Sequence, residues 1–220
     1  MTLCHFKNKM IPLILKLKKE EYKRIALAQD IVIEELYNIF NKAVLHGGTS
    51  IWRCYQGNRF SEDIDVYIQK ENEKINRFFK NLQKKGFVIL KKKISENSLY
   101  SNLQLDRTFV KFEALFRKIK GSLKEYTTSD GNLVTVYTLI PEELIKEKID
   151  TYVKRRKIRD LYDIFFLLRY VKEKNEISNK IKIFLKNFQN PIDEEELKVL
   201  IFDGLVPKTE EMLNYIKRFK

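Results

Sequence analysis

Apolar side chains recur at helical spacing and then at strand spacing along the first third of the chain. Between residues 18 and 40 they return every three or four positions with Lys, Arg and Glu between them, which predicts an amphipathic helix. The apolar run 43–45 predicts a short strand that leads into a glycine pair, and a second helix is expected over 49–55. Alternation of apolar and polar residues over 63–68 predicts another strand.

The middle of the chain changes from one helix to a series of short strands. Residues 71–85 suit a helix that ends at Gly86, because glycine readily adopts the left-handed conformation found after helices. Turn-forming residues then separate β-prone runs at 87–90, 99–105, 109–116 and 133–139. These runs predict most of a β-sheet.

From Pro141 onward the pattern is helical. Proline in the first turn, followed by Glu142 and Glu143, is typical of a helix start. Further helices are expected at about 160–174, 177–188, 193–202 and 208–219. The whole pattern predicts an α+β fold, with a mixed-sheet core and an N-terminal helix in residues 1–140 and a helical region in residues 141–220.

Length and charge narrow the class of protein. With 220 residues, 44% of them hydrophobic, the chain can bury a substantial core. Its 43 Lys and Arg residues against 30 acidic ones give a formal net charge of +13, which favours a polyanionic partner, nucleic acid first. A lysine-rich genome or a thermophilic composition would give the same balance with scattered lysines, so charge alone does not decide between the two.

The cysteines and the start of the chain bear on its location. Cys4 and Cys54 offer neither a disulfide framework nor metal-ligand spacing, which fits a reducing cytoplasm. The apolar run MIPLIL near the start is broken by Pro12, is too short to span a bilayer and lacks a small-residue cleavage site. We therefore expect a soluble cytoplasmic protein with no membrane partner.

The glycine pair is the first part of the candidate site. Gly47 and Gly48, followed by Thr49 and Ser50, can form a tight turn whose bare backbone N–H groups face an anion. The two hydroxyls could add further hydrogen bonds. The segment therefore predicts a cradle for phosphate groups.

Two acids follow the glycine pair. Asp63 and Asp65 lie two positions apart on a predicted strand, so their carboxylates point to the same side. Two like charges held that close repel each other unless they are protonated or bridged by a cation. Mg²⁺, with Mn²⁺ as the second choice, prefers carboxylate oxygens and usually completes its shell with substrate phosphates. A phosphate cradle beside such a pair predicts phosphoryl or nucleotidyl transfer; a solvated acidic strand end is the alternative.

The segment HGGTSIWRCYQGNRFSEDIDVYI, residues 46–68, resembles the signature of a known superfamily. Members of the DNA polymerase β-like nucleotidyltransferase superfamily carry a Gly-Gly or Gly-Ser turn followed by Asp-x-Asp. The combination of GGT with Arg-Phe-Ser-x-Asp-Ile-Asp is similar to AbiEii/AbiGii-type toxins of toxin–antitoxin and phage-defence systems. The resemblance implies a nucleotidyltransferase-type mixed sheet flanked by helices.

A two-metal transfer site generally needs a third acidic ligand, and a neighbouring strand should supply it. In the run 110–115, alternation places Lys111 and Glu113 on one face. A Lys followed two positions later by an acid resembles the second motif of the family, although Asp is more usual there, so Glu113 is a departure that bears on metal geometry. An exposed ion pair is the structural alternative, and Asp106, in a predicted turn, is the rival acid.

Lys148 interrupts the apolar stripe of the helix that starts at Pro141. A lysine on a core-facing stripe is costly unless its amine has an anionic partner. Arg155, seven residues on, shares that side of the helix. Both side chains are therefore candidates to grip a triphosphate or to stand near the leaving pyrophosphate.

The same segment also resembles the family, which shows Lys-x-x-Ala…Arg…Arg-Asp-x-Tyr/Phe-Asp-Leu. The matching residues are Lys148, Arg155, Arg159, Asp160, Tyr162 and Asp163, with Thr151 in place of the usual small residue. Asp160 and Asp163 are neighbours on one helix face. We expect them, with Lys111 and Arg159, to support the site; helix capping and a part in activating the acceptor are the alternatives.

Two other features carry weaker signals. The basic run 154–159 is a contact for an RNA backbone, a solvated helix end, or both. His46 and His5 are not expected to be catalytic, and packing at a strand end is the role that suits His46.

These residues predict an enzyme that moves a nucleoside monophosphate from an NTP to an acceptor hydroxyl. Asp63, Asp65 and Glu113 would hold Mg²⁺, while Lys148 and Arg155 would complete the phosphate clamp. The family likeness implies tRNA or another RNA end as the acceptor and a cognate antitoxin protein as a partner. Transfer to a protein hydroxyl, a metal-dependent phosphodiesterase and a nucleic-acid-binding module without turnover are the alternatives.

Overall fold

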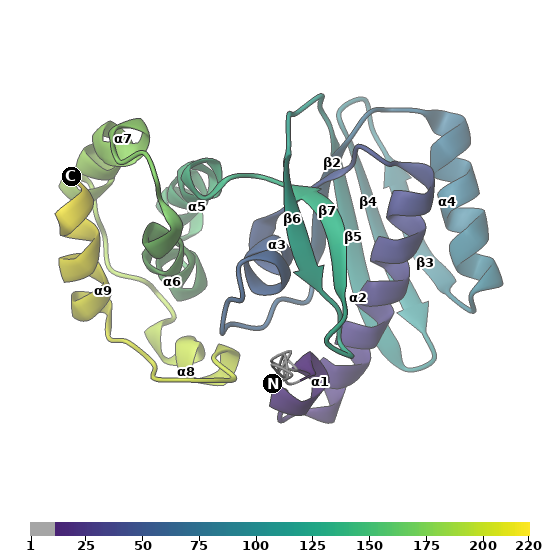
Figure 1. Cartoon of the computed structure of the whole chain (residues 1–220), viewed down its shortest axis with the longest axis horizontal. Helices are drawn as coiled ribbons and strands as arrows, with labels where there is room; N and C mark the ends of the chain where they lie inside the picture. The colour runs from purple at the N-terminus through teal and green to yellow at the C-terminus, as the bar shows by residue number, and fades with distance from the viewer. Residues whose placement is uncertain (1–11) are drawn as a thin grey trace, which may run out of the picture.

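The structure, a computed structural model, describes residues 12–220, and Figure 1 shows two parts. A β-sheet with helices packed against it forms one part, and a cluster of helices from the C-terminal third stands beside it. The predicted α+β fold with a helical C-terminal region is thus confirmed. Cys4 and His5, on which predictions were made, lie outside the described residues.

Seven strands form one mixed sheet in the order β3-β4-β5-β2-β1-β7-β6. Their bounds are β1 (Val44–His46), β2 (Ile64–Ile68), β3 (Val88–Ile94), β4 (Ser98–Leu105), β5 (Thr108–Phe116), β6 (Ser122–Thr127) and β7 (Leu133–Thr138). Strand β1 runs antiparallel to β2 and parallel to β7, and β2 runs parallel to β5. The short strands β1 and β2 therefore bring the glycine pair and the acids together at the centre of the sheet.

The helices fall into two groups around this sheet. Their bounds are α1 (Leu13–Lys16), α2 (Glu20–Ile39), α3 (Gly47–Cys54), α4 (Asn72–Lys84), α5 (Pro141–Arg155), α6 (Ile158–Leu167), α7 (Asn175–Lys186), α8 (Leu197–Leu200) and α9 (Thr209–Ile216). Figure 1 shows α2 and α4 beside one face of the sheet and α5 to α9 clustered away from it. Within residues 12–220, no helix is long and apolar enough to cross a bilayer.

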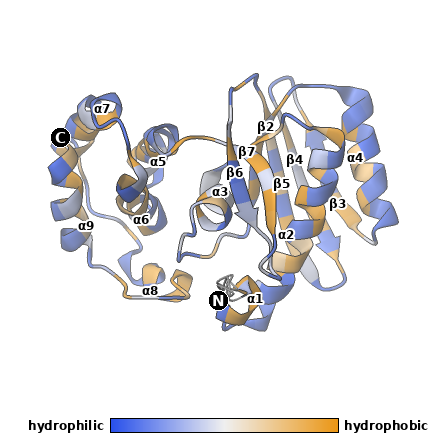
Figure 2. Cartoon of the chain, viewed as in Figure 1, coloured by the Kyte–Doolittle hydropathy of each residue, from blue (hydrophilic) through white to orange (hydrophobic). Residues whose placement is uncertain are grey.

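One face of the β3–β4–β5 half of the sheet is buried and the other is open. Along β5, buried and exposed side chains alternate, as they do when one face of a sheet is packed and the other is solvated. The buried Phe112 packs on Phe78 of α4, with ring centroids 4.9 Å apart, although most residues of α4 are hydrophilic (Figure 2). Lys111 and Glu113 point to the opposite face, which α2 and α4 leave free.

Two elements were not predicted. Strand β6 was missed because Lys124 and Glu125 lie in its centre and most of its side chains are exposed. Such a sequence gives little strand signal, and β6 is an edge strand that pairs with β7 alone. The four-residue helix α1 was missed as well.

The helical region is more broken than the pattern predicts. Helix α5 ends at Arg155, and Arg156 adopts a left-handed conformation with φ 48°. The basic run 154–159 therefore spans the end of α5, a two-residue turn and the start of α6, and is not one helix. The predicted helix 160–174 ends at Leu167 and continues as a 3-10 turn, and only Leu197–Leu200 of the predicted helix 193–202 is α-helical.

Candidate active site

The glycine pair connects the central strand β1 directly to helix α3. Gly47 is the first residue of α3 and has φ +69°, a conformation that favours glycine. A Cβ atom at this position would lie 2.2 Å from Oδ2 of Asp65. The predicted turn is thus the first turn of the helix, and glycine is required because the carboxylate of Asp65 lies against it.

The hydroxyls of Thr49 and Ser50 do not face an anion site. The Thr49 hydroxyl donates a 2.5 Å hydrogen bond to the backbone carbonyl of Asp63, and the Ser50 hydroxyl is hydrogen-bonded to that of Thr138. Both side chains are fully buried. The prediction that these two hydroxyls contact phosphate is wrong, because they tie α3 to the sheet; the N–H groups of the first helical turn remain the candidate phosphate donors.

Two of the three predicted carboxylates are neighbours across the sheet. Asp65 of β2 and Glu113 of β5 are direct partners in the parallel register. Side chains paired in this way share a face and lie within one strand spacing, about 5 Å. The third acid, Asp63, directly precedes β2, two residues before Asp65.

The carboxylate of Asp63 has a partner of its own. Its Oδ1 lies 3.6 Å from Nζ of Lys111, the lysine two residues before Glu113. Among residues 12–220, no group of three or more His, Cys, Asp or Glu side chains is arranged to hold a metal ion. The expectation of three acids already gathered around a metal is therefore not met: two are paired in register, and the third is held by a lysine.

The charges of Asp65 and Glu113 are poorly compensated. Burial raises the pKa of Asp65, and His46 and Lys148 oppose that shift only in part. Loss of hydration also raises the pKa of Glu113, and the charges of Asp65 and Asp63 raise it further. Like charges held close together are the arrangement that a bound cation relieves.

A polar cluster that the sequence pattern did not predict lies next to Asp65. His46 is the antiparallel partner of Asp65, and its ring stacks on Tyr67 with centroids 4.1 Å apart. Glu147 of α5 lies 3.3 Å from Nδ1 of His46 and accepts a 2.5 Å hydrogen bond from the Tyr67 hydroxyl. Burial would raise the pKa of Glu147, but the hydrogen bond with His46 and the charge of its ring outweigh it and lower the pKa.

The packing role predicted for His46 is present in the stack on Tyr67, but the residue also belongs to this polar cluster. The signal for Glu147 was available, since it directly precedes Lys148 in the family-like segment. Its contact with β1 and β2 depends on how α5 docks on the sheet, which helical spacing does not give.

Lys148 and Arg155 are both paired with buried acids. Nζ of Lys148 lies 2.7 Å from Oδ2 of Asp163 and 3.4 Å from Oδ1 of Asp160. Arg155 binds Asp160 with both arms of its guanidinium, at 2.7 and 2.9 Å. The predicted supporting role of Asp160 and Asp163 agrees with these pairs, in which the two acids hold both cations in place.

Arg59 completes this network and was not among the predicted site residues. Its guanidinium donates two 2.8 Å hydrogen bonds to the two carboxylate oxygens of Asp163. Burial would raise the pKa of Asp163, but Arg59 and Lys148 together outweigh it and lower the pKa. Arg159 makes no ion pair within the described part of the chain, so the structure does not place it in the network.

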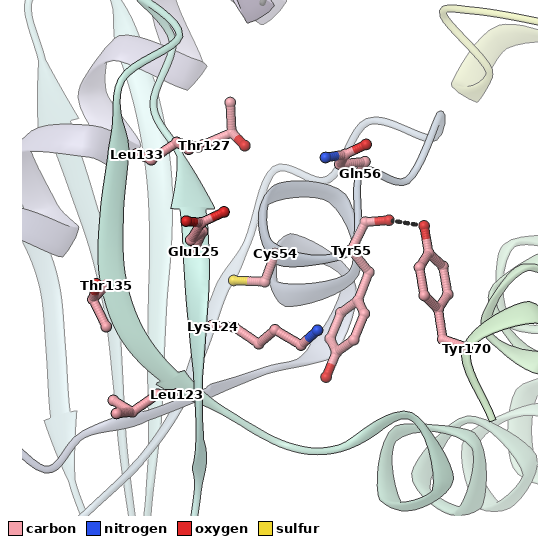
Figure 3. A pocket seen from close by; sticks show the side chains of 10 residues that line it. All are labelled: Cys54, Tyr55, Gln56, Leu123, Lys124, Glu125, Thr127, Leu133, Thr135 and Tyr170. Atoms are coloured by element: carbon pink, nitrogen blue, oxygen red, sulfur yellow. Dashed lines mark hydrogen bonds between the residues drawn. The ribbon is translucent and has the colours of Figure 1, made fainter. Parts of the chain in front are cut away.

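A separate cavity lies at the far end of α3. It has a volume of about 490 Å³ and is lined by the last residue of α3, the two residues that follow it, and strands β6 and β7 (Figure 3). The Tyr170 hydroxyl donates a 2.7 Å hydrogen bond to the carbonyl of Tyr55 at its edge. The site residues predicted from the sequence are not among those that line it.

Comparison with known proteins agrees with this geometry. The family model described as nucleotidyl transferase AbiEii toxin, type IV toxin–antitoxin system, matches residues 34–218. No curated protein sequence is significantly similar to the chain.

Two solved structures have the same fold. MenT4, a nucleotidyltransferase toxin from Mycobacterium tuberculosis H37Rv, matches with a TM-score of 0.65 and 18% identity over 90% of this chain and 82% of its own. JHP933 from Helicobacter pylori matches with a TM-score of 0.61 and 18% identity over 91% of this chain and 90% of its own. The family model covers most of the chain, including the acids on β2 and β5 and the network on α5 and α6. The chain belongs to the AbiEii family of toxin nucleotidyltransferases.

Proposed function

We propose that this nucleotidyltransferase uses Mg²⁺ to move a nucleoside monophosphate from an NTP to a hydroxyl at the end of an RNA. The observation that carries the proposal is the pairing of Asp65 with Glu113 in the register of β2 and β5, on the open face of the sheet. Both acids have a raised pKa because burial and neighbouring carboxylates disfavour their charged forms. A pair of this kind gains most from a divalent cation.

The donor set fits such an ion. Asp65 and Glu113 offer oxygen ligands side by side, and Asp63 adds a third if it exchanges Lys111 for the metal. The exposed pair between Asp63 and Lys111 is weak, since ion pairs in contact with water contribute about 0–1 kcal/mol. When bound, Mg²⁺ would supply charge neutralisation for the triphosphate and a lowered pKa for the acceptor hydroxyl.

The start of α3 and Lys148 suit the phosphates of the NTP. The first-turn N–H groups of α3 stand beside Asp65, since Gly47 contacts that side chain. Lys148 lies close enough to Asp65 to lower its pKa, and Asp163 holds the amine in place. Arg155 remains 40% exposed and is the second cation that we assign to the triphosphate.

The transfer is a displacement at phosphorus. The acceptor oxygen forms a bond to the α-phosphorus, and the bond between that phosphorus and the oxygen bridging to the β-phosphate breaks. Pyrophosphate leaves with the electron pair, and the hydroxyl proton passes to a carboxylate of the cluster. This chain contributes the positions of the two reactants and the charges around them.

The net charge and the family support the remaining partners. The formal net charge of +13 suits an RNA acceptor, which the protein would meet in the cytoplasm. The family model describes a toxin of a toxin–antitoxin system, and we propose a cognate antitoxin as the second protein partner. Both assignments go beyond the family membership itself.

Labelled nucleotides test the proposal directly. The protein would be incubated with each α-labelled NTP in turn, Mg²⁺ and total RNA, and label on RNA would be counted after gel separation. We expect label on RNA with the wild-type chain and none with Asp63→Ala/Asp65→Ala. Asp106→Asn is a matched control, because this acid lies in the β4–β5 turn at φ 51°, a conformation that Asn also adopts.

Other outcomes distinguish the alternatives. Shortened RNA without label would indicate a phosphodiesterase, and RNA binding without label would indicate a binding module. Label on protein instead of RNA would move the acceptor to a protein hydroxyl. Incorporation that persists in chelator would contradict the proposed metal requirement.

A further inference from the structure

The open face of the sheet continues well beyond the two paired acids. Residues of β4 and β3 follow Glu113 in the antiparallel register, with Tyr100 opposite Glu113 and Lys93 opposite Tyr100. A row of side chains on one face thus runs from Asp65 through Glu113 and Tyr100 to Lys93. Neighbouring strands are about 4.8 Å apart, so this row extends roughly 10 Å from Glu113.

A second row runs parallel to the first. Lys111 of β5 lies opposite Asn102 of β4, and Asn102 lies opposite Lys91 of β3. The amine of Lys91 lies 5.3 Å from the centre of the Tyr100 ring, and the Tyr100 hydroxyl donates a 2.8 Å hydrogen bond to Asn102. These contacts confirm that the side chains of both rows share one face.

An aromatic ring stands at the end of this face. Phe109 of β5 is 59% exposed and lies on the same side of the strand as Lys111 and Glu113. The ring therefore adds an accessible aromatic surface beside the two rows.

The opposite face of β3 is different. Lys92 points toward α4, where its amine lies 4.7 Å from the centre of the Phe79 ring and 3.2 Å from Oδ1 of Asn76. Three consecutive lysines on β3 are therefore divided by the alternation of the strand. Lys91 and Lys93 face the open side, and Lys92 faces the helix.

We propose that this open face binds the single-stranded end of the acceptor RNA and delivers its terminal hydroxyl to Asp65 and Glu113. We call the face the acceptor platform and define it by Lys91, Lys93, Tyr100, Asn102, Phe109 and Lys111. The inference rests on the proposed function, because the acceptor is RNA only there. It adds where the acceptor lies and in which form it binds.

The chemistry of the platform matches an unpaired strand. Aromatic rings on an open sheet stack on exposed bases, and flanking lysines neutralise the phosphates between them. The Asn102 amide offers both donors and acceptors to base edges or to a ribose hydroxyl. Because the platform is continuous with the carboxylate pair, a strand lying on it would end at the reacting centre.

Binding measurements on the full chain test the platform without relying on turnover. A fluorescently labelled, unstructured RNA of about 12 nucleotides would be titrated with each variant in the absence of NTP and Mg²⁺. Lys91→Glu and Lys93→Glu should each weaken binding by roughly fivefold or more. Each should also make the slope of log K against log salt concentration shallower by about 0.7, the value for one lost phosphate contact on a single strand. Tyr100→Ala should weaken binding by roughly fivefold or more through lost stacking.

Lys92→Glu is the matched control, since it makes the same charge change on the same strand but on the opposite face. It should leave affinity within about twofold, because nonspecific long-range attraction is screened at physiological salt. Thermal melts of all four variants would show that each is folded. RNA labelling by the variants, measured at a limiting RNA concentration, should decrease in the same order as RNA affinity.

Several results would overturn the platform. Equal weakening by Lys92→Glu and Lys93→Glu would show that only overall charge matters. Wild-type affinity in the face variants, with RNA still labelled, would place the acceptor elsewhere and leave the proposed function standing. Equal binding of a duplex of the same sequence would remove the single-strand claim. If the face variants no longer bound a co-expressed antitoxin but still bound RNA, the face would be a protein interface. Failure of the wild-type chain to label RNA would instead remove the proposed function on which the platform rests.

Discussion

Two groups of acids lie near each other in this protein and have opposite surroundings. Asp65 and Glu113 lie side by side on the sheet, and burial, with repulsion from neighbouring carboxylates, raises the pKa of both. Asp163 is more deeply buried, yet Arg59 and Lys148 lower its pKa. Burial alone therefore does not decide the state of a carboxyl group here; the number of cations in contact with it does.

The difference indicates two roles: Asp65 and Glu113 are placed to bind a ligand, whereas Asp163 stabilises the fold. Each oxygen of Asp163 has a basic partner in the chain itself. The sheet acids have incomplete compensation, and this is the signature of a functional site in which stability is given up for binding. Substitutions in each of the two groups test this difference.

The largest expected effect is on activity. Asp65→Asn should lower nucleotide transfer by at least about a hundredfold, because a neutral amide cannot hold a metal ion or compensate its charge. The same substitution should raise the free energy of unfolding by up to about 1 kcal/mol, since it removes a repelling buried charge. Initial rates and urea denaturation of the same preparation measure both. A loss of stability together with activity would show that Asp65 is structural.

The next largest effect is on stability. Asp163→Asn should lower the free energy of unfolding by roughly 3–5 kcal/mol, because it leaves the buried charge of Arg59 without its carboxylate partner and removes the closer partner of Lys148. Asp150→Asn is the control, since its ion pair with Lys180 is exposed and should contribute less than about 1 kcal/mol. Denaturant titration measures both variants. A similar small change in the two would mean that the buried network is not tightly coupled.

A smaller effect is expected at the glycine that contacts Asp65. Gly47→Ala should lower the free energy of unfolding by about 1–3 kcal/mol, because an L residue at φ +69° is strained and its Cβ would displace the carboxylate. Transfer should fall as well, although no charge has changed. Gly86→Ala has a similarly positive φ of +94° but no side chain closer than 3.4 Å, so it should lose stability and keep transfer activity.

The smallest effect is the pH dependence of the two acids. The folded pKa of Asp163 is below its ordinary value of 3.8, so its stabilisation is present above 3.8 and is lost as the pH falls through the folded pKa. The folded pKa of Asp65 is above 3.8, so its charge destabilises the fold increasingly as the pH rises from 3.8 through the folded pKa.

We therefore expect the stability gain of Asp65→Asn to grow as the pH rises above 3.8. The loss caused by Asp163→Asn should persist above 3.8 and shrink below it. Urea titrations on both sides of that pH would measure the two differences. Parallel curves for both variants would contradict the opposite pKa directions.

Sequence alone predicted the order of elements and much of the site. Alternation identified β2 and β5 and gave the face of Glu113, because a strand with one packed side has a period of two. It could not give the register that pairs Asp65 with Glu113, since the two strands are joined by long intervening segments. The edge strand β6 gave no signal, because charged residues lie in its centre and most of its side chains are exposed.

Side-chain partners were the least predictable part. Nothing in the spacing of Thr49 and Ser50 shows that their hydroxyls bond inward, because serine and threonine serve cradles and helix contacts equally well. The role of Arg59 depends on contact with Asp163, which lies 104 residues away in the chain. Whether a cation is free or paired depends on tertiary packing, which cannot be read from sequence pattern or composition.

Adjacent residues of α5 attach to different parts of the protein. Glu147 is hydrogen-bonded to the sheet through Tyr67, while Lys148 is bonded to α6 through Asp163. A fragment that stops at residue 140 would keep Asp63, Asp65 and Glu113 and lose both of these anchors. We expect such a fragment to be catalytically inactive even if it folds, because the site is built from residues of both the sheet and the C-terminal helices.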